Sequence, residues 1–455
     1  MRSLSTLFHK NSLNIKWILL FFVIVYHGFL FYSLKHQPVN LRDSVEYLNS
    51  ASSFEDEANF YAGPPSADRD YRLYSKRTPL YPLVLHSLNK LHLHRNYIYL
   101  LQLFLGLSSI LLTFIFISHF VKKTFFPYLF LSIFLIFTPS QFIYSQFIMA
   151  DLWLQFFVML VLFSYLQFHK TQRIAWLIGI VIWSTLAALT KPVFLLASFG
   201  CSLVFVWHII KNKRKQWVVL VALVPFLSWG LICNQNNKWT GVFHYSSIGY
   251  INLLHYNTNL YLQSAIGPSE ASKKLEPLML VPHSKIEFKK QYNQTNEVCK
   301  QVIVSNFFGY TLFHLKGMAY FFLDPGRFDL YQFFRVIDTN TEGFLNQKPG
   351  FGQIQAHFKR HPKLWVYLGL IFCFNLLKTI GFLGFILIHR KNKVIILAAM
   401  LVFYIAFLTG PLGASRFALP VALIAMCAAA IFYANLCVKF LQRQSELKSK
   451  KITNL

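Results

Sequence analysis

Acidic residues are scarce in this sequence. The chain has 17 Asp and Glu against 44 Lys and Arg, and only 13% of its residues are charged, whereas about 25% is usual in soluble domains. Several apolar runs are long enough to cross roughly 30 Å of hydrocarbon, which excludes a soluble globular protein. The formal charge of +27 would suit nucleic acid, but Lys and Arg gather in short segments between apolar runs, as is typical of membrane orientation signals. We therefore expect membrane lipids, and no nucleic acid, as partners.

Paired cysteines are also missing. None of the six cysteines belongs to a CxxC motif, and Cys201, Cys373, Cys427 and Cys437 fall inside apolar runs. Neither a disulfide framework nor a zinc site is indicated. The first apolar run, 17–34, follows a basic segment and lacks a small-residue cleavage site, so it predicts an uncleaved first span.

The apolar runs predict an all-α polytopic membrane protein with about 10–12 transmembrane helices. The runs assigned as spans are 17–34, 97–119, 125–139, 149–168, 174–190, 192–209, 217–233, 364–389, 394–410 and 415–440. The short run 79–93 carries polar residues, and we expect it to lie along the outer surface. Both termini and the basic loops, which include Lys122, Lys123, Lys213, Arg214 and Lys215, then fall on the cytoplasmic side.

Three regions follow from this topology. Residues 1–233 form an N-terminal transmembrane catalytic module that includes the first outer loop, 35–96. Residues 234–363 form a mostly polar outer segment, in which the run 302–323 contains His314 and Lys316 and fits an interfacial helix better than a span. Residues 364–455 form the C-terminal transmembrane helices and a basic cytoplasmic tail.

The acids lie almost entirely on one side of the membrane in this topology. Every Asp and Glu except Glu446 falls outside or at the outer boundary, and many stand in the stretch 41–82. The cytoplasmic face therefore has little that could act as a base or hold a metal for a nucleotide-sugar reaction. Activated sugars outside the cell membrane are generally carried on lipids, so the sequence favours a lipid-linked donor.

Two acids are candidate catalytic residues. Asp43 follows the first span closely, where partial desolvation would favour a carboxylate that accepts a proton from an acceptor hydroxyl or amine. Asp43 and Glu46 also have capping-box spacing, so helix capping and base catalysis are equally open for Asp43. Asp151 is the lone acid at the start of an apolar run; a functional role and a role as an ordinary first-turn residue are both open.

Three cations are candidate phosphate ligands. Lys191 and Arg416 are the Lys and Arg of the short outer turns, where the topology rule disfavours positive charge. A leaving phosphate needs such cations, although long side chains at helix ends also reach the interface for simple solvation. Arg77 could grip a phosphate with two hydrogen bonds, and Arg72 and Lys76 compete with it for that role.

Several short motifs occur in a fixed order. They are D-x-x-x-Y at Asp43 and Tyr47, R-x-P-x-Y-P at Arg77, Pro79, Tyr81 and Pro82, the acid Asp151 opening a span, L-T-K-P at Leu189 to Pro192, and R-F-x-x-P at Arg416, Phe417 and Pro420. In this order the chain resembles the C-type (GT-C) membrane glycosyltransferases. The resemblance is strongest to bacterial relatives of protein O-mannosyltransferases and to lipid A aminoarabinose transferases.

The resemblance implies a GT-C-like fold with surface helices in the first outer loop and an inverting sugar transfer from a polyprenyl-phosphate donor. It implies Asp43 as general base, with Asp151 as a second catalytic acid. Arg77, Lys191 and Arg416, with Tyr47 and Tyr81, would bind the substrate. The enzyme would sit in the bacterial inner membrane. The paired Asp-Glu of eukaryotic mannosyltransferases is Asp43-Ser44 here, which speaks against mannose or a protein hydroxyl.

The predicted function is therefore sugar transfer to a glycan, lipid or protein acceptor on the outer side of the membrane. A divalent metal is compatible with the resemblance, but the sequence shows no clear ligand set, and no other cofactor is expected. The alternative is a flippase or transporter of lipid-linked sugars, which would require functional charges deep inside spans. A noncatalytic membrane partner is a third reading, in which the outer acids are simply solvated.

Overall fold

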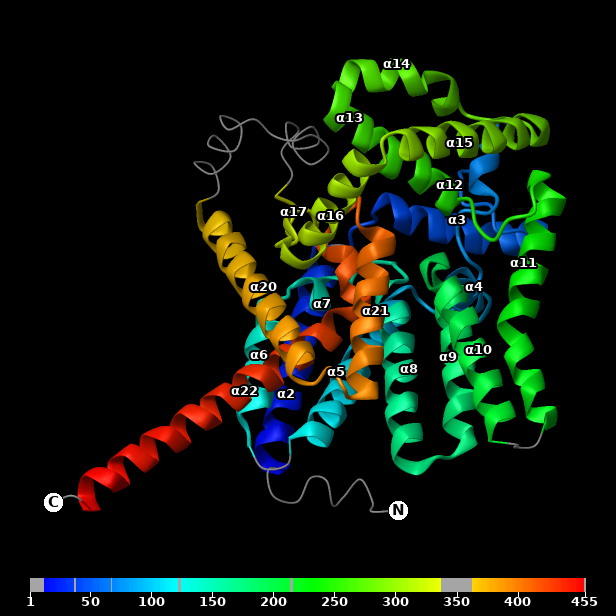
Figure 1. The fold of residues 1–455 in the computed structure, drawn as a ribbon. Helices are drawn as coiled ribbons and strands as arrows, with labels where there is room; N and C mark the ends of the chain where they lie inside the picture. Colours follow the sequence, from blue (N-terminus) through cyan, green and yellow to red (C-terminus); the bar gives the residue numbers. More distant parts are fainter. Residues whose placement is uncertain are drawn as a thin grey trace.

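The fold is entirely helical over the residues that the computed structural model describes, which are 12–36, 38–66, 68–121, 124–212, 216–336 and 362–453. The predicted spans are all present as apolar helices (Figure 1). They are α2 (Ser12–Lys35), α5 (Asn96–Phe120), α6 (Phe126–Ile136), α8 (Asp151–Thr171), α9 (Ile174–Thr190), α10 (Leu195–Lys211), α11 (Val224–Thr240), α20 (Pro362–Ile388), α21 (Lys393–Thr409) and α22 (Ser415–Thr453). The all-α polytopic prediction is confirmed.

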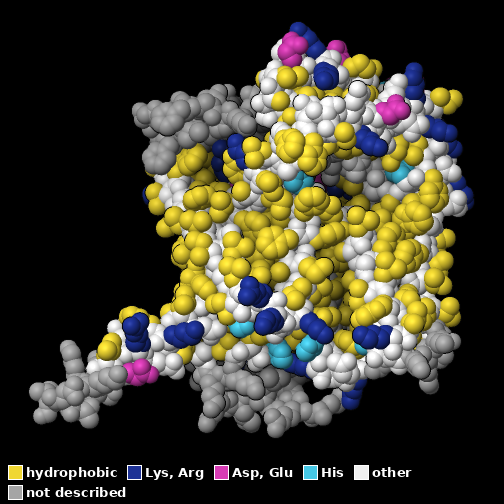
Figure 2. All heavy atoms as spheres, in the orientation of Figure 1, with side chains coloured by type: hydrophobic (Ala, Val, Ile, Leu, Met, Phe, Trp, Pro, Cys, Tyr) yellow, Lys and Arg dark blue, Asp and Glu magenta, His cyan; other side chains and the backbone are white. Residues whose placement is uncertain are grey.

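Seven helices of the described chain are long and apolar enough to cross a membrane, and α6, α9 and α21 are shorter apolar helices. Figure 2 shows a broad hydrophobic surface between two charged ends of the molecule. In Figure 1, α2 begins and α22 ends at the end of the bundle opposite to α14 and α15. The start of α2 and the end of α22 thus lie on the same side of the bundle. The basic loop residues Lys122, Lys123, Lys213, Arg214 and Lys215 lie outside the described residues, as does the stretch 337–361 of the outer segment.

The remaining helices belong to the loops. They are α3 (Arg42–Glu57), α4 (Leu80–Lys90), α7 (Ser140–Ile143), α12 (Ile248–Asn252), the π-helical turn Leu253–Asn259, α13 (Leu260–Ile266), α14 (Pro268–Met279), α15 (Lys285–Ser305), α16 (Phe307–Leu323) and α17 (Arg327–Phe333). At 11 residues α4 is too short to span a bilayer, and it packs against α3, α5 and α9. Helix α16 is not among the candidate spans and packs against α20, α21 and α22.

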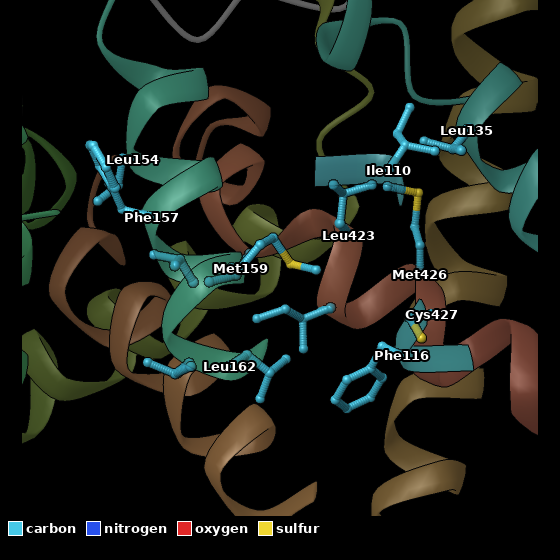
Figure 3. Close-up of a cluster of buried hydrophobic side chains, with 14 of the residues drawn as sticks. Ile110, Phe116, Leu135, Leu154, Phe157, Met159, Leu162, Leu423, Met426 and Cys427 are labelled. Carbon is cyan, nitrogen blue, oxygen red and sulfur yellow. The ribbon is translucent and has the colours of Figure 1, made fainter. Parts of the chain in front are cut away.

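The core of the bundle is a contiguous cluster of buried side chains from α5, α6, α8 and α22. Figure 3 shows Ile110, Phe116, Leu135, Leu154, Phe157, Met159, Leu162, Leu423, Met426 and Cys427 converging on this interior. Between membrane helices such side chains hold the bundle together through close van der Waals packing, because lipid tails are as apolar as the side chains themselves. The cluster fixes the starts of α8 and α22 relative to each other, and these two helix starts carry Asp151 and Arg416.

Two backbone features shape the ends of the apolar helices nearest to α3. Pro192 has no N–H group to continue a helix, so α9 ends at Thr190 and the chain turns outward at Lys191 before α10. Gly317 of α16 lies so close to the end of α21 that a Cβ atom on it would meet the backbone oxygen of Gly410 at 1.8 Å. This contact requires glycine and holds α16 against the loop that leads to Arg416.

The orientation of the bundle is testable with single cysteines in a background free of the native ones. Ser66 lies exposed in the first loop, and Thr171 lies exposed at the opposite end of α8. We expect a membrane-impermeant maleimide to label Ser66→Cys in intact spheroplasts and Thr171→Cys only after permeabilisation. The reverse pattern would place the first loop in the cytosol.

Candidate active site

Asp43 lies between two guanidinium groups. Its carboxylate oxygens are each 2.6 Å from a guanidinium nitrogen, Oδ1 from Arg77 Nη2 and Oδ2 from Arg416 Nη2. The capping-box interpretation is wrong, because the N-cap of α3 is Leu41 and no side chain caps the helix. Asp43 stands in the first helical turn instead, and its side chain turns toward cations from two distant parts of the chain.

Asp151 opens α8 and is almost fully buried, with 1% of its side chain exposed. Its Oδ1 lies 2.7 Å from Lys191 Nζ and 3.4 Å from Arg416 Nε, while Oδ2 has no hydrogen-bond partner among the described residues. Arg416 thus contacts both predicted catalytic acids. The three predicted phosphate ligands and the two acids meet in one place, although they are distributed over more than 370 positions of sequence.

Glu46 and Lys76 extend the cluster; Glu46 was not predicted as a site residue, and Lys76 was named only as a competitor of Arg77 for the phosphate. Glu46 is one helical turn after Asp43, so both side chains share a face of α3. Its Oε2 lies 2.5 Å from Arg77 Nη2, and its Oε1 lies 2.6 Å from Lys76 Nζ. Arg72 bonds Asp70 at 2.9 Å and takes no part. We call the linked series Lys76, Glu46, Arg77, Asp43, Arg416, Asp151 and Lys191 the ion-pair chain.

The two predicted tyrosines form a wall beside the ion-pair chain. The Tyr47 ring packs edge-on against Tyr81 with the ring centroids 4.9 Å apart, and the Arg77 guanidinium lies 4.6 Å from the Tyr47 centroid. The Tyr81 hydroxyl donates a hydrogen bond to Gln102 at 2.8 Å. Tyr81 is completely buried, and its ring contact helps to hold the Tyr47 ring in position beside Arg77.

A backbone contact joins the first loop to the turn after α9. The Thr78 hydroxyl, next to Arg77 in the chain, donates a hydrogen bond to the Thr190 carbonyl at 2.8 Å. Thr190 precedes Lys191, so this bond sets the distance between two cations of the ion-pair chain. The R-x-P-x-Y-P and L-T-K-P motifs are therefore adjacent in space.

The ion-pair chain has four cations and three carboxylates, so it carries one positive charge in excess. Burial raises the pKa of Asp43, but Arg416 and Arg77 outweigh it and hold that pKa far below its usual value. Burial lowers the pKa of Lys191, an effect that Asp151 opposes. Asp43 is therefore ionised and poorly basic as long as both guanidinium groups remain bound to it.

The arrangement does not suit a divalent metal. No three His, Cys, Asp or Glu side chains of the described residues come together as a metal site. Glu46, Asp43 and Asp151 each bind a Lys or Arg instead. A cation from solvent would have to displace these side chains to reach the carboxylates.

A second acidic cluster holds Ser415, the residue before Arg416, and sequence patterns did not predict it. Asp324 accepts a hydrogen bond from the Ser415 backbone N–H at 2.6 Å, and Asp329 accepts one from the Ser415 hydroxyl at 2.9 Å. The Tyr144 hydroxyl donates to the other Asp329 oxygen at 2.6 Å. Ser415 begins α22, so these bonds fix the position from which Arg416 reaches the ion-pair chain.

Comparisons with known proteins give a distant structural likeness. No protein-family model matches the chain, and a search of curated proteins finds no significant match. Among solved structures the chain is similar to ArnT from Cupriavidus metallidurans bound to undecaprenyl phosphate, at 15% identity and a TM-score of 0.37, covering 92% of this chain and 77% of that one. The apo state of the same protein is similar at 14% identity and a TM-score of 0.38, covering 92% of this chain and 78% of that one.

The buried pair of Asp151 and Lys191 can be tested with a double-mutant cycle. Asp151→Asn leaves Lys191 without its buried counter-charge, whereas Arg416 keeps Asp43, and removing one partner of a buried pair costs roughly 3–5 kcal/mol. We expect a large drop in the thermal unfolding temperature in detergent for Asp151→Asn and a smaller drop for Asp151→Asn with Lys191→Met, because the second change removes the orphaned charge. Additive losses would show that the two side chains are not coupled.

The stability of the fold should depend on pH through Asp329. Burial raises the pKa of Asp329 to about 7 from an ordinary value of 3.8, although bonds from Tyr144 and Ser415 oppose the shift. Between these two pH values the folded state binds a proton that the unfolded state has lost, so stability falls as pH rises through this window and levels off above about 7. The fall should amount to a few kcal/mol at most, on the order of 1.4 kcal/mol per pH unit.

Unfolding temperatures measured from about pH 4 to 8 check this expectation. Asp329→Asn should flatten the dependence, because an amide can still accept from Tyr144 without ionising. The exposed Asp68→Asn serves as a control that keeps it. An unchanged slope in Asp329→Asn would assign the dependence to another group.

Proposed function

We propose that this protein is an inverting membrane glycosyltransferase of the GT-C type, which moves a sugar from a polyprenyl-phosphate donor to an acceptor on the outer side of the bacterial inner membrane. The observation that carries the proposal is the ion-pair chain. It brings a carboxylate, Asp43, between cations suited to phosphate at one end of a hydrophobic bundle. The acceptor is a glycan, a lipid or a protein.

Donor binding begins with an exchange of anions. Arg77 and Arg416 hold Asp43 in the structure, and a guanidinium binds phosphate oxygens in the same two-bonded manner as it binds carboxylate oxygens. A lipid phosphate that enters beside Lys191 competes with Asp43 for these groups. The single excess positive charge of the ion-pair chain favours the entry of an anion.

Release of Asp43 makes it a base. Once the donor phosphate occupies Arg77 and Arg416, Asp43 loses the charges that lower its pKa, while its burial continues to raise it. Asp43 then takes the proton of an acceptor hydroxyl or amine as that group attacks the anomeric carbon. The bond from the anomeric carbon to the phosphate oxygen breaks on the opposite face, which inverts the configuration.

The departing lipid phosphate gains negative charge as this bond breaks. Arg77, Arg416 and Lys191 are placed to stabilise that charge, and fixed cations in a site shielded from water act most strongly at this step. Asp151 keeps Arg416 and Lys191 in place while Asp43 changes partners. Asp151 therefore serves as the constant anchor of the site and Asp43 as the exchangeable group.

The test follows release of free polyprenyl phosphate from purified protein with polyprenyl-phosphate sugars and candidate acceptors. Asp43→Asn should slow release roughly 100- to 10,000-fold, the usual contribution of a general base, and should still bind the lipid phosphate. The matched control is Asp56→Asn, an exposed position on the same helix, which should leave the rate unchanged. Equal rates in Asp43→Asn and the unaltered protein would remove Asp43 from the reaction.

A flippase of lipid-linked sugars is the second candidate, and Lys378 favours it. Lys378 lies inside the span α20, is 8% exposed, and donates hydrogen bonds to the Thr138 hydroxyl at 2.7 Å and to the Phe137 carbonyl at 3.3 Å. A charge buried in a span is often functional. Proteoliposomes that move the lipid-linked sugar across the bilayer without forming a glycosidic product would support this second candidate over the first.

A further inference from the structure

A large groove opens on the side of the bundle between α8, α10 and α21. Its cavity volume is about 830 Å³, toward the upper end of the roughly 300–1,000 Å³ of a typical small-molecule pocket. Its walls are mainly apolar, with Leu196, Val204, Leu397 and Leu401 among them. Figure 2 shows this region as a hollow in the hydrophobic surface, with Lys, Arg and His side chains along its lower edge.

The groove has a basic end. Lys211 and His208 of α10, Lys393 of α21 and His169 of α8 line it, so three different helices supply these side chains. No Asp or Glu is among the described residues that line the groove. A hydrophobic cavity bordered by cations at one end complements a molecule with long hydrocarbon chains and an anionic head.

The basic end lies at the membrane face opposite to the ion-pair chain. Helix α8 starts at Asp151 in the ion-pair chain, and His169 near its other end lines the groove. A helix of 21 residues rises roughly 30 Å, which equals the thickness of the hydrocarbon core. Trp207 is 59% exposed with Lys211 Nζ 4.8 Å from its ring centroid, an arrangement typical of the interface between hydrocarbon and headgroups.

We propose that this groove is a binding site for an anionic phospholipid from the leaflet opposite to the ion-pair chain. The acyl chains lie along α8, α10 and α21, and the phosphate binds Lys211 and Lys393. A donor whose phosphate is bound at the ion-pair chain would present only its hydrocarbon tail at the basic end of the groove. That tail carries no charge that could pair with Lys211 and Lys393. The cations therefore favour a lipid whose charged head resides at this face.

The lysines are tested by native mass spectrometry of the full chain from nanodiscs of equal phosphatidylglycerol and phosphatidylcholine. We expect the unaltered protein to retain phosphatidylglycerol in preference, and Lys211→Gln with Lys393→Gln to weaken its binding about tenfold or more, since each Lys near a membrane surface contributes about a factor of five. The control, Arg390→Gln with Lys391→Gln, removes the same charge from a loop at the same end that does not line the groove. It should retain the lipid.

The groove itself is tested by filling it. Gly200 of α10 lines the groove, and a Cβ atom there would meet open space, so Gly200→Phe should block the acyl chains without disturbing the helix. Gly230 of α11 is equally open and lies outside the groove, which makes Gly230→Phe the matched control. Gly200→Phe should lose the retained phosphatidylglycerol and Gly230→Phe should keep it.

Three results would overturn the proposal. They are equal retention of the two phospholipids, equal loss in the lysine variants and their control, and retention of added polyprenyl phosphate that Gly200→Phe abolishes and Lys211→Gln with Lys393→Gln leaves unchanged. The last would identify the groove as the site of the donor's chain. All of these readouts measure lipid retention and none measures sugar transfer, so they test the lipid site independently of the proposed function.

Discussion

The candidate site depends on the contact of Arg416 with two carboxylates. Asp151 is buried and Asp43 is partly buried, and two neighbouring carboxylates repel each other, so a cation shared between them favours the ionised form of both. A guanidinium suits this task because its planar fork presents several donors at once. Lys191 and Arg77 then complete the neutralisation at either side.

Much of the surrounding architecture holds Arg416 in its position. Ser415 is bonded to Asp324 and Asp329 from the outer segment, and the close approach of Gly317 to Gly410 keeps α16 against the preceding loop. The large outer segment is thus a structural part of the site and not an appendage to it. The buried cluster in Figure 3 also holds Arg416 in position, because it packs α22 against α8 deeper in the bundle.

The sequence predicted the helices and the membership of the site better than it predicted the contacts within the site. Apolar runs specify helices directly, because a membrane requires every backbone group to be bonded within its own segment. Asp43, Asp151, Arg77, Lys191 and Arg416 were expected on one side, and they do meet. Their pairing with one another was not foreseen, because charge spacing along a chain does not reveal which side chains meet after folding.

Asp43 and Asp329 show why local patterns were insufficient. The spacing of Asp43 and Glu46 fits a helix cap, yet both carboxylates bind Arg77, since a charged partner in a shielded place outcompetes a backbone N–H. Asp329 stands after a Pro-Gly turn in a polar segment, where an acid is ordinarily solvated. Only the packing of α17 against α7 brings it to Tyr144 and Ser415 and buries it.

Under the proposed function, the binding of Asp43 by both Arg77 and Arg416 determines whether donor or acceptor must bind first. A resting enzyme whose base is occupied by two guanidinium groups cannot activate water or an acceptor that arrives early. Only the donor frees the base, so the kinetics should be of compulsory order, with the lipid first. Because Asp43 cannot activate water while both guanidinium groups bind it, the enzyme without donor has no active base and does not promote hydrolysis of the lipid-linked sugar.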